Sequence, residues 1–430
     1  MNSIVLKLKS LNSNDILNYV FIFYAFCLPL SRAGIVLSIF LMIIFWIIEG
    51  NFKYKFKVIF KNKFIVFSTI LCIYLLFTVL FKDSLSYDFN HFKRLWYYIA
   101  LFVIITSIKK EYIFKCLSVF IIAMMISEIY SYGIFFELLT SKHGSVEDPT
   151  PFMNHSHYGV FLSFTALLLL NRFFLEKRCP KTKIIYAIFF ITVVGNLFIT
   201  GGRMGQLAFL ISIFILIFNL FEHKIRAFFI SIALVLVIVI LAFNFSNTFQ
   251  KRVYEAQNDI KNLFIENNYN TSWGLRASAW VVTYEILKKN PLFGTSIADI
   301  DNDYKKMVID DKIVNMEYND INEMATLWAG YHNDFLELTS GGGLVAFMLF
   351  ILAFLYLFKM KIKNQEFNNI KIIFLSIFLI SIMADNFLRY QFTMNLFIFI
   401  VGILIAYYNY ESLENTKSIN NNQRIENSKI

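Results

Sequence analysis

Residues 331–343 place titratable side chains at the start of a long apolar run. They read YHNDFLELTSGGG. If a helix begins near His332, the positive end of its dipole disfavours a charged imidazole, and the neutral ring could accept a proton or a hydrogen bond. Asn333 could bind the same ligand, whereas Asp334 and Glu337 suit the first turn of a helix without any chemistry. Taken alone, the histidine fits either a base or a residue at the membrane interface.

Two arginines could bind an anionic group. Arg203 lies in TGGRMGQ, residues 200–206, where glycines let a ligand or another backbone approach closely. Arg276 lies in the first turns of a predicted helix in TSWGLRASAWVVTYEILKKNPLFG, residues 271–294, on the same face as Trp280. A helix N-terminus with an added arginine suits an anion, and a cation there opposes the dipole, which favours a ligand role. The alternatives are a snorkelling Arg203 in a tight turn and an Arg276 exposed on a helix lying on the bilayer.

A pair of histidines, His155 and His157, lies in PTPFMNHSHYGVF, residues 149–161. Their spacing suits metal ligands on a strand but not on one face of a helix, and no third ligand is evident in the sequence. We therefore assign no metal to this pair and keep both histidines as candidate substrate-binding residues. The four cysteines show no pair spacing, so the sequence predicts neither a disulfide framework nor a zinc site.

The elements that must position these residues are membrane spans. Of the 430 residues, 57% are hydrophobic, and long apolar runs recur along the chain. The net charge of +10 does not indicate nucleic-acid binding, because the basic residues lie between the apolar runs and not on one face of a domain. We predict an all-α, polytopic integral membrane protein with about twelve transmembrane helices. The predicted spans are 16–31, 33–48, 64–81, 95–108, 112–139, 157–175, 183–200, 204–220, 225–245, 332–358, 371–388 and 392–409.

Lysine and arginine are concentrated in alternate short loops, which predicts that both termini are cytoplasmic. The predicted domains are nine spans in 1–245, an outer loop with amphipathic helices in 246–331, three spans in 332–410 and a disordered cytoplasmic tail in 411–430. The candidate stretches then share the outer face. The spans carry little charge away from their ends, with Glu128 as the main exception, which argues for chemistry at the outer interface and against a transport path.

This arrangement resembles the O-antigen ligase and O-antigen polymerase family. The resemblance rests on twelve spans, the large outer loop, the Gly-Arg turn at 200–206, the R-x3-W segment running into NPLFG at 276–294 and the HNDFLE segment in 331–345. It implies a membrane glycosyltransferase with a GT-C-like fold in the bacterial inner membrane, its active site facing the periplasm. The implied donor is a glycan on undecaprenyl diphosphate. The implied acceptor is the lipid A-core oligosaccharide in a ligase, or a second lipid-linked repeat unit in a polymerase.

By motif match, the resemblance implies that Arg203 and Arg276 hold the diphosphate, that His332 assists the acceptor hydroxyl and that no metal ion or other cofactor is needed. Guanidinium groups bind phosphate in a bidentate manner, so two arginines could neutralise the leaving group. We favour a ligase over a polymerase because the Gly-Arg turn is short and the HNDFLE entry compact. The other predicted contacts are membrane lipids. The acidic residues of 296–330 have no assigned role.

Overall fold

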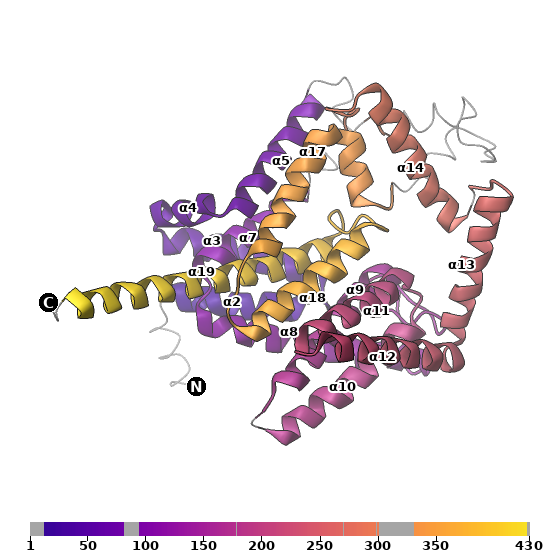
Figure 1. Cartoon of the computed structure of the whole chain (residues 1–430), viewed down its shortest axis with the longest axis horizontal. Helices are drawn as coiled ribbons and strands as arrows, with labels where there is room; N and C mark the ends of the chain where they lie inside the picture. Colours follow the sequence, from indigo (N-terminus) through magenta and orange to yellow (C-terminus); the bar gives the residue numbers. More distant parts are fainter. Residues whose placement is uncertain are drawn as a thin grey trace.

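The computed structural model describes residues 13–80, 94–177, 179–269, 271–297, 299–300 and 331–427. Within these ranges the chain forms helices and no strand, apart from an isolated bridge between Ser145 and Asp148 (Figure 1). The helices are α2 Ser13–Cys27, α3 Arg32–Glu49, α4 Phe52–Lys61, α5 Lys63–Leu80, η1 Leu95–Tyr98, α7 Ile99–Ser107, α8 Lys110–Phe135, α9 His155–Leu175, α10 Pro180–Ile199, α11 Arg203–Leu220, α12 Lys224–Phe245, α13 Asn247–Ile265, α14 Ser272–Lys289, α17 Asp334–Lys359, α18 Gln365–Ile382 and α19 Gln391–Asn427. The predicted all-helical class is therefore confirmed.

Nine helices in the described part of the chain are long and apolar enough to cross a membrane, or ten if the bent pair α4 and α5 counts as one span. Each of the twelve predicted spans overlaps a helix, but α2 and the segment Leu95–Ser107 are too short to pass the same test. The protein is thus a multi-pass membrane protein, and the count of twelve is not confirmed.

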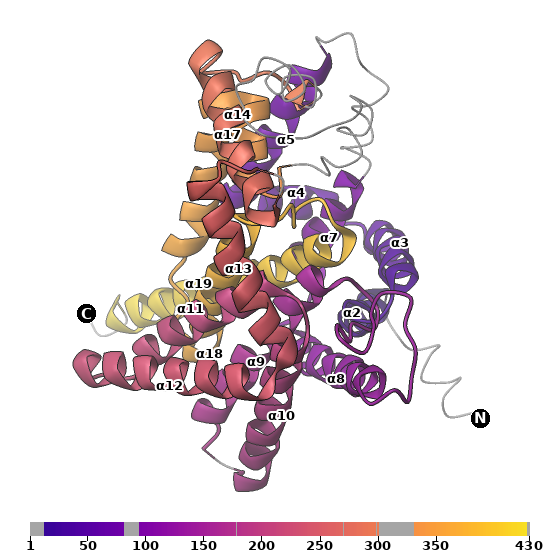
Figure 2. The same cartoon turned by 90° about the vertical axis from the view of Figure 1, so that its right-hand side faces the viewer.

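Burial separates the central helices from those that face lipid. Residues 392–407 of α19 are all buried, and the helix packs against α7, α8, α9 and α18. Helix α12 is apolar around its circumference and mostly exposed, as expected of a helix surrounded by lipid. Helices α13 and α14 lie outside this bundle, along one edge in Figure 1, and Figure 2 views that edge directly.

Two element boundaries differ from the sequence prediction. Helix α18 ends at Ile382, so the predicted span 371–388 extended too far and included a polar turn at 383–390. Helix α19 runs on to Asn427, where the composition predicted a disordered tail from residue 411. Extending an existing helix needs no new nucleus, which explains why a polar sequence can continue it. Most of the acidic stretch of 296–330 lies outside the described residues.

Glycines set the close contact between α9 and α11. A Cβ at Gly205 would lie 2.4 Å from the backbone of Gly159, so Gly205 cannot carry a side chain at this crossing, and a Cβ at Gly159 would lie 3.2 Å from the Cα of Gly205. The Ser163 hydroxyl lies between the two helices, 2.6 Å from the carbonyl oxygen of Gly159 and 2.7 Å from that of Gly205. The glycine of the TGGRMGQ stretch that follows Arg203 therefore serves helix packing, and it fixes Arg203 beside the start of α9.

At a break inside α17, the glycine run of this helix is bound to the NPLFG segment that follows α14. Gly343 has φ of 63°, which interrupts the helix and frees the N–H groups that follow. The Leu344 N–H donates to the carbonyl of Pro291 at 3.0 Å, and the Ser296 N–H donates to the carbonyl of Gly341 at 3.0 Å. The NPLFG segment after α14 is thus bound to the glycine run in α17 through backbone hydrogen bonds. Helix α5 reaches the same glycine run from another side, because a Cβ at Gly342 would lie 2.9 Å from the Leu75 side chain and 3.1 Å from that of Tyr74.

We expect Gly343→Ala to destabilise the protein more than Gly50→Ala. Both glycines have positive φ, which costs an L-residue about 1–2 kcal/mol. A Cβ at Gly343 would also lie 2.2 Å from the carbonyl oxygen of Leu292, whereas a Cβ at Gly50 would meet nothing within 4 Å. The unfolding temperatures of the two purified variants in detergent measure the difference. Equal decreases would contradict the proposed docking of the NPLFG segment.

Candidate functional site

The start of α17 is bound to the turn between α18 and α19. The Asn333 side chain caps α17 by accepting a hydrogen bond from the Leu336 N–H at 3.1 Å, and its amide donates to the Met383 carbonyl at 2.8 Å. His332 precedes the cap with φ of 46°, a left-handed conformation that is uncommon for a non-glycine residue. Its Nδ1 lies 3.3 Å from Oδ1 of Asp385 in the same turn. The histidine ring is therefore positioned by a carboxylate from another element.

The two acids of the first turn of α17 face the same turn. Oδ2 of Asp334 accepts the Leu388 N–H at 3.1 Å. Glu337 pairs with Arg389 at 3.0 Å and also accepts a hydrogen bond from the Asn386 amide. Both carboxylates are buried. They suit the N-terminus of a helix, and they also bind α17 to this turn. The backbone that carries Asp385 is thereby held from both sides.

Charge also stabilises this turn. Burial alone would raise the pKa of Asp385, but hydrogen bonds from His332 and from the Asn386 N–H, with the nearby His157, lower it below its ordinary value. Burial works against the charge of Arg389, yet Glu337 raises the pKa of that guanidinium. The turn therefore keeps a carboxylate at Asp385 and a guanidinium at Arg389.

Arg276 reaches the same turn from α14. Its Nε donates to the Ala384 carbonyl at 3.2 Å, and its Nη1 donates to the carbonyl and hydroxyl oxygens of Ser272 at 2.8 and 2.7 Å. Burial lowers the pKa of the guanidinium, an effect that the charge of Asp385 opposes. The structure thus brings Arg276 and His332 to adjacent residues of one turn, although 56 positions separate them in the sequence.

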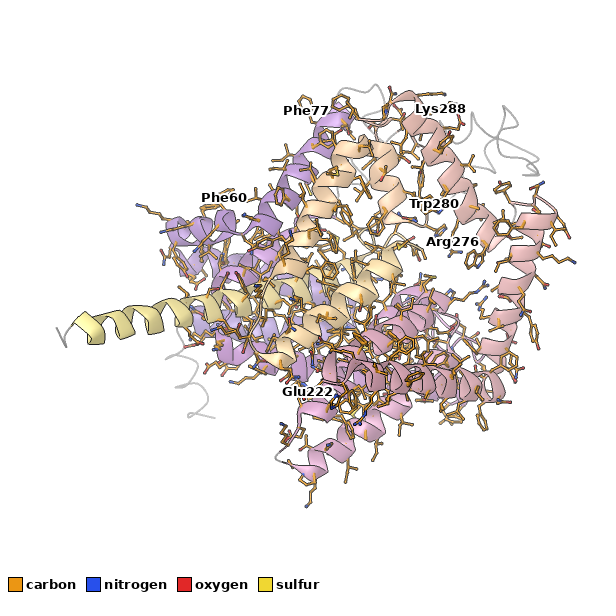
Figure 3. All side chains as sticks on the ribbon, viewed as in Figure 1. Phe60, Phe77, Glu222, Arg276, Trp280 and Lys288 are labelled. Atoms are coloured by element: carbon orange, nitrogen blue, oxygen red, sulfur yellow. The ribbon has the colours of Figure 1, made fainter. Side chains whose placement is uncertain are left out.

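Trp280 lies one helical turn beyond Arg276, and Figure 3 shows both on α14 with Lys288 at the far end of the helix. Trp280 lines an apolar groove of about 490 Å³ between α14 and α17, together with Tyr284, Asn333 and Met383. A second apolar groove, of about 330 Å³, is formed by α5, α7, α17 and α19.

Asp334, Glu337 and Arg389 are among the residues that line the second groove. Helical periodicity puts the residues of α17 that line the two grooves on opposite faces of its first turns. Each groove therefore joins apolar walls to the polar turn at 383–390.

Arg203 lies in the same polar region but is held by acids of α13. Its Nη2 donates to Glu255 at 2.6 Å, and its Nη1 lies 3.7 Å from Asp259. The charges of Arg203 and Asp259 both act on Arg276. Burial would raise the pKa of Glu255, but Arg252 and Arg203 lower it. An anion that binds Arg203 must therefore compete with these carboxylates.

The two histidines of α9 have different partners. His155 Nδ1 lies 2.7 Å from Asp148, whose other oxygen accepts the Gly201 N–H at 2.8 Å. The His157 ring is buried against Phe387 and Tyr390, with centroids 5.7 and 4.5 Å away. Divergent contacts do not suit a shared metal ion. His157 supports the turn at 383–390, and a substrate contact for either histidine stays a prediction.

The sequence did not reveal the charged residues that hold the predicted site residues in place. Asp385 and Arg389 lie in DNFLR, which the span prediction placed at the end of an apolar run. A carboxylate, an amide and an arginine within five residues of such a run were the available signal. Glu255 and Asp259 are four residues apart, so they lie on one face of α13, but their pairing with Arg203 depends on the tertiary fold.

We expect acidification to remove a stabilising contribution of Asp385. Because its pKa is lower in the folded protein than the ordinary value of about 3.9, the unfolded chain takes up the proton first. The contribution is fully present above about pH 4 and is lost as the pH falls through the lowered folded-state pKa. The difference in unfolding temperature between the wild type and Asp385→Asn should therefore narrow below about pH 4. A constant difference between pH 3 and pH 6 would contradict the lowered pKa of Asp385 in the folded protein.

Part of this site lies in a segment that matches a family model. Residues 187–351 match the model of a family described as O-antigen ligase. An uncharacterized protein of Haemophilus influenzae (strain ATCC 51907 / DSM 11121 / KW20 / Rd) is 25% identical over 230 residues, which are 52% of this chain and 55% of that protein, so the match spans about half the length of this relative. The expected resemblance to the O-antigen ligase and O-antigen polymerase family is thereby confirmed over residues 187–351, which include Arg203, Arg276 and His332.

Proposed function

We propose that the protein is an O-antigen ligase that transfers a glycan from undecaprenyl diphosphate to the lipid A-core oligosaccharide. The observation that carries the proposal is the convergence of His332 and Arg276 on residues 384–385, inside the segment that matches the family. The guanidinium of Arg276, which could bind a diphosphate, then lies close to the imidazole of His332, which could accept the proton of a hydroxyl. The reaction takes place at the periplasmic face of the inner membrane, in a GT-C-like fold.

In the proposed reaction His332 acts as the base. Asp385 accepts a hydrogen bond from Nδ1–H, which leaves the lone pair of Nε2 free to take the proton of the acceptor hydroxyl. The acceptor oxygen forms a bond to the anomeric carbon as the bond from that carbon to the phosphate oxygen breaks. Both electrons of the broken bond leave with undecaprenyl diphosphate. The proton remains on His332 until it is released to water or to the departing diphosphate.

Arg276 and Arg203 neutralise the charge that develops on the leaving group. Guanidinium groups in a site shielded from water stabilise such charge strongly, and they bind phosphate oxygens in a bidentate manner. Arg276 is half-buried next to the turn that holds His332, which suits it to the phosphate nearest the sugar. Arg203 is paired with Glu255, so the incoming diphosphate takes the place of that carboxylate.

The two apolar grooves support a reaction between two lipid-borne partners. Each is lined mainly by apolar side chains and by residues at the first turn of α17, on opposite sides of that turn. A prenyl chain and an acylated acceptor are both apolar molecules with polar ends. Both could therefore present their reacting groups to the turn at 383–390 while their chains stay in the grooves.

We expect His332→Ala and Arg276→Ala to abolish glycan transfer in cells that lack the chromosomal gene. Loss of a general base typically costs about 10²–10⁴-fold in rate, and Arg276→Lys should keep only part of the activity because lysine cannot bind phosphate in a bidentate manner. Lys288→Ala is the matched control, since Lys288 is exposed in the last turn of the same helix. Immunoblots must show equal amounts of each variant in the membrane.

The readout is a gel of lipopolysaccharide together with the pool of lipid-linked glycan. The proposal predicts core without O-antigen and an accumulation of long lipid-linked chains. Core capped by a single repeat unit would instead identify a polymerase. Normal O-antigen in both alanine variants would overturn the assignment of the site residues.

A further inference from the structure

Helix α4 is nearly perpendicular to α5, the helix that follows it. It reads FKYKFKVIFK from Phe52 to Lys61 and meets α5 at an angle of 87°, with the break at Asn62. Neither the sequence motifs nor the proposed reaction uses this helix. Its residues divide into three faces: one against the protein, one aromatic and one basic.

The protein face of α4 fixes the helix in place. Ile59 and Lys55 are buried, and α4 packs against α5 and α7. The Lys55 ammonium donates to the Trp46 carbonyl at 2.7 Å and pairs with Glu49 at 2.8 Å, both at the end of α3. A lysine buried and paired in this way holds the helix in one orientation, so its other two faces point consistently away from the bundle.

The aromatic face consists of Phe52, Phe56 and Phe60. These rings follow one another at four-residue spacing, with centroids 6.3 and 6.2 Å apart. All three are exposed, and Phe60 reaches 66% (Figure 3). A ridge of exposed phenylalanines on a helix beside membrane spans is best accommodated by the acyl chains of lipid.

The basic face consists of Lys53, Lys57 and Lys61. Each follows a phenylalanine by one residue, so this ridge is rotated by about 100° from the aromatic one. All three lysines are exposed, and no carboxylate in the described ranges lies within ion-pair distance of them. Three unpaired cations beside an aromatic ridge are complementary to phosphate groups at the membrane surface.

We propose that α4 is an interfacial helix that binds the headgroups of anionic phospholipids. Phe52, Phe56 and Phe60 enter the acyl region while Lys53, Lys57 and Lys61 lie among the phosphates. The angle of 87° to α5 suits this arrangement, because a helix nearly perpendicular to a span can lie along the bilayer surface. The positive charges favour anionic lipid over a zwitterionic one of the same chain length.

The anchored helix is connected to the candidate site through α5. The Asn62 side chain caps α5 by accepting the Ile65 N–H at 3.2 Å, and the Tyr74 hydroxyl donates to the Gly342 carbonyl at 2.8 Å. Gly342 adjoins the break in α17 that follows the segment carrying His332. An effect of lipid charge on glycan transfer is therefore expected, and only this consequence rests on the proposed function.

The test uses the full-length protein in detergent, titrated with short-chain phosphatidylglycerol or phosphatidylcholine and analysed by native mass spectrometry. The triple variant Lys53→Gln/Lys57→Gln/Lys61→Gln should bind phosphatidylglycerol about tenfold more weakly than the wild type. The triple lysine-to-arginine variant should retain binding. The matched control Lys251→Gln/Lys288→Gln/Lys289→Gln removes three exposed lysines of α13 and α14 and should also retain it.

Equal affinity of the wild type and the glutamine variant for phosphatidylglycerol would overturn the proposal, as would equal affinity of the wild type for the two lipids. If α4 instead served to bind a protein, the pure lipid would show no dependence on these lysines, which is the same overturning result. An unchanged unfolding temperature in lipid-free detergent shows that the variants fold. No glycan substrate is present, so the outcome is independent of the proposed transfer reaction.

Discussion

The ionised carboxylate of Asp385 is the group on which the arrangement of the site depends. A charge buried at the edge of a membrane must be satisfied by protein groups, since an unpaired one would be costly. The Asn386 N–H and His332 satisfy it directly. The pair between Glu337 and Arg389 and the bond from Asp334 to the Leu388 N–H fix the backbone around it. His332 and Arg276 meet at this turn because each is hydrogen-bonded to it.

Backbone hydrogen bonds supply the second constraint. The segment 291–296 lies on the glycine run of α17, which joins the end of α14 to the first turns of α17. This contact fixes the distance between the helix that carries Arg276 and the one that follows His332. A side chain at Gly343 would occupy the space of the backbone at Leu292, and one at Gly341 would occupy the space of the Ile297 side chain. Two motifs that are far apart in the sequence, the NPLFG segment and the glycine run of α17, are thus in direct contact in the fold.

The sequence predicted those features that depend on residues close together in the chain. Apolar runs predicted the helices, and the long run in 332–358 placed the start of α17 within two residues of its first residue, Asp334. The glycines around Arg203 were identified as points of close approach, but the sequence did not show what approaches them. The partners of Arg203, His155 and His332 come from α13, from the loop before α9 and from the turn after α18. Such pairings across the fold leave no periodic signal in one sequence.

The central claim is that Arg203 and Arg276 together bind a lipid diphosphate next to His332. A cryo-electron microscopy structure of the full chain in nanodiscs with undecaprenyl diphosphate tests it most directly. The account predicts density for the diphosphate between the two guanidinium groups, with Glu255 no longer bonded to Arg203 and an open space in front of His332 Nε2. A diphosphate bound elsewhere, for example beside Arg94 and Arg389, with the Arg203–Glu255 pair intact, would contradict it.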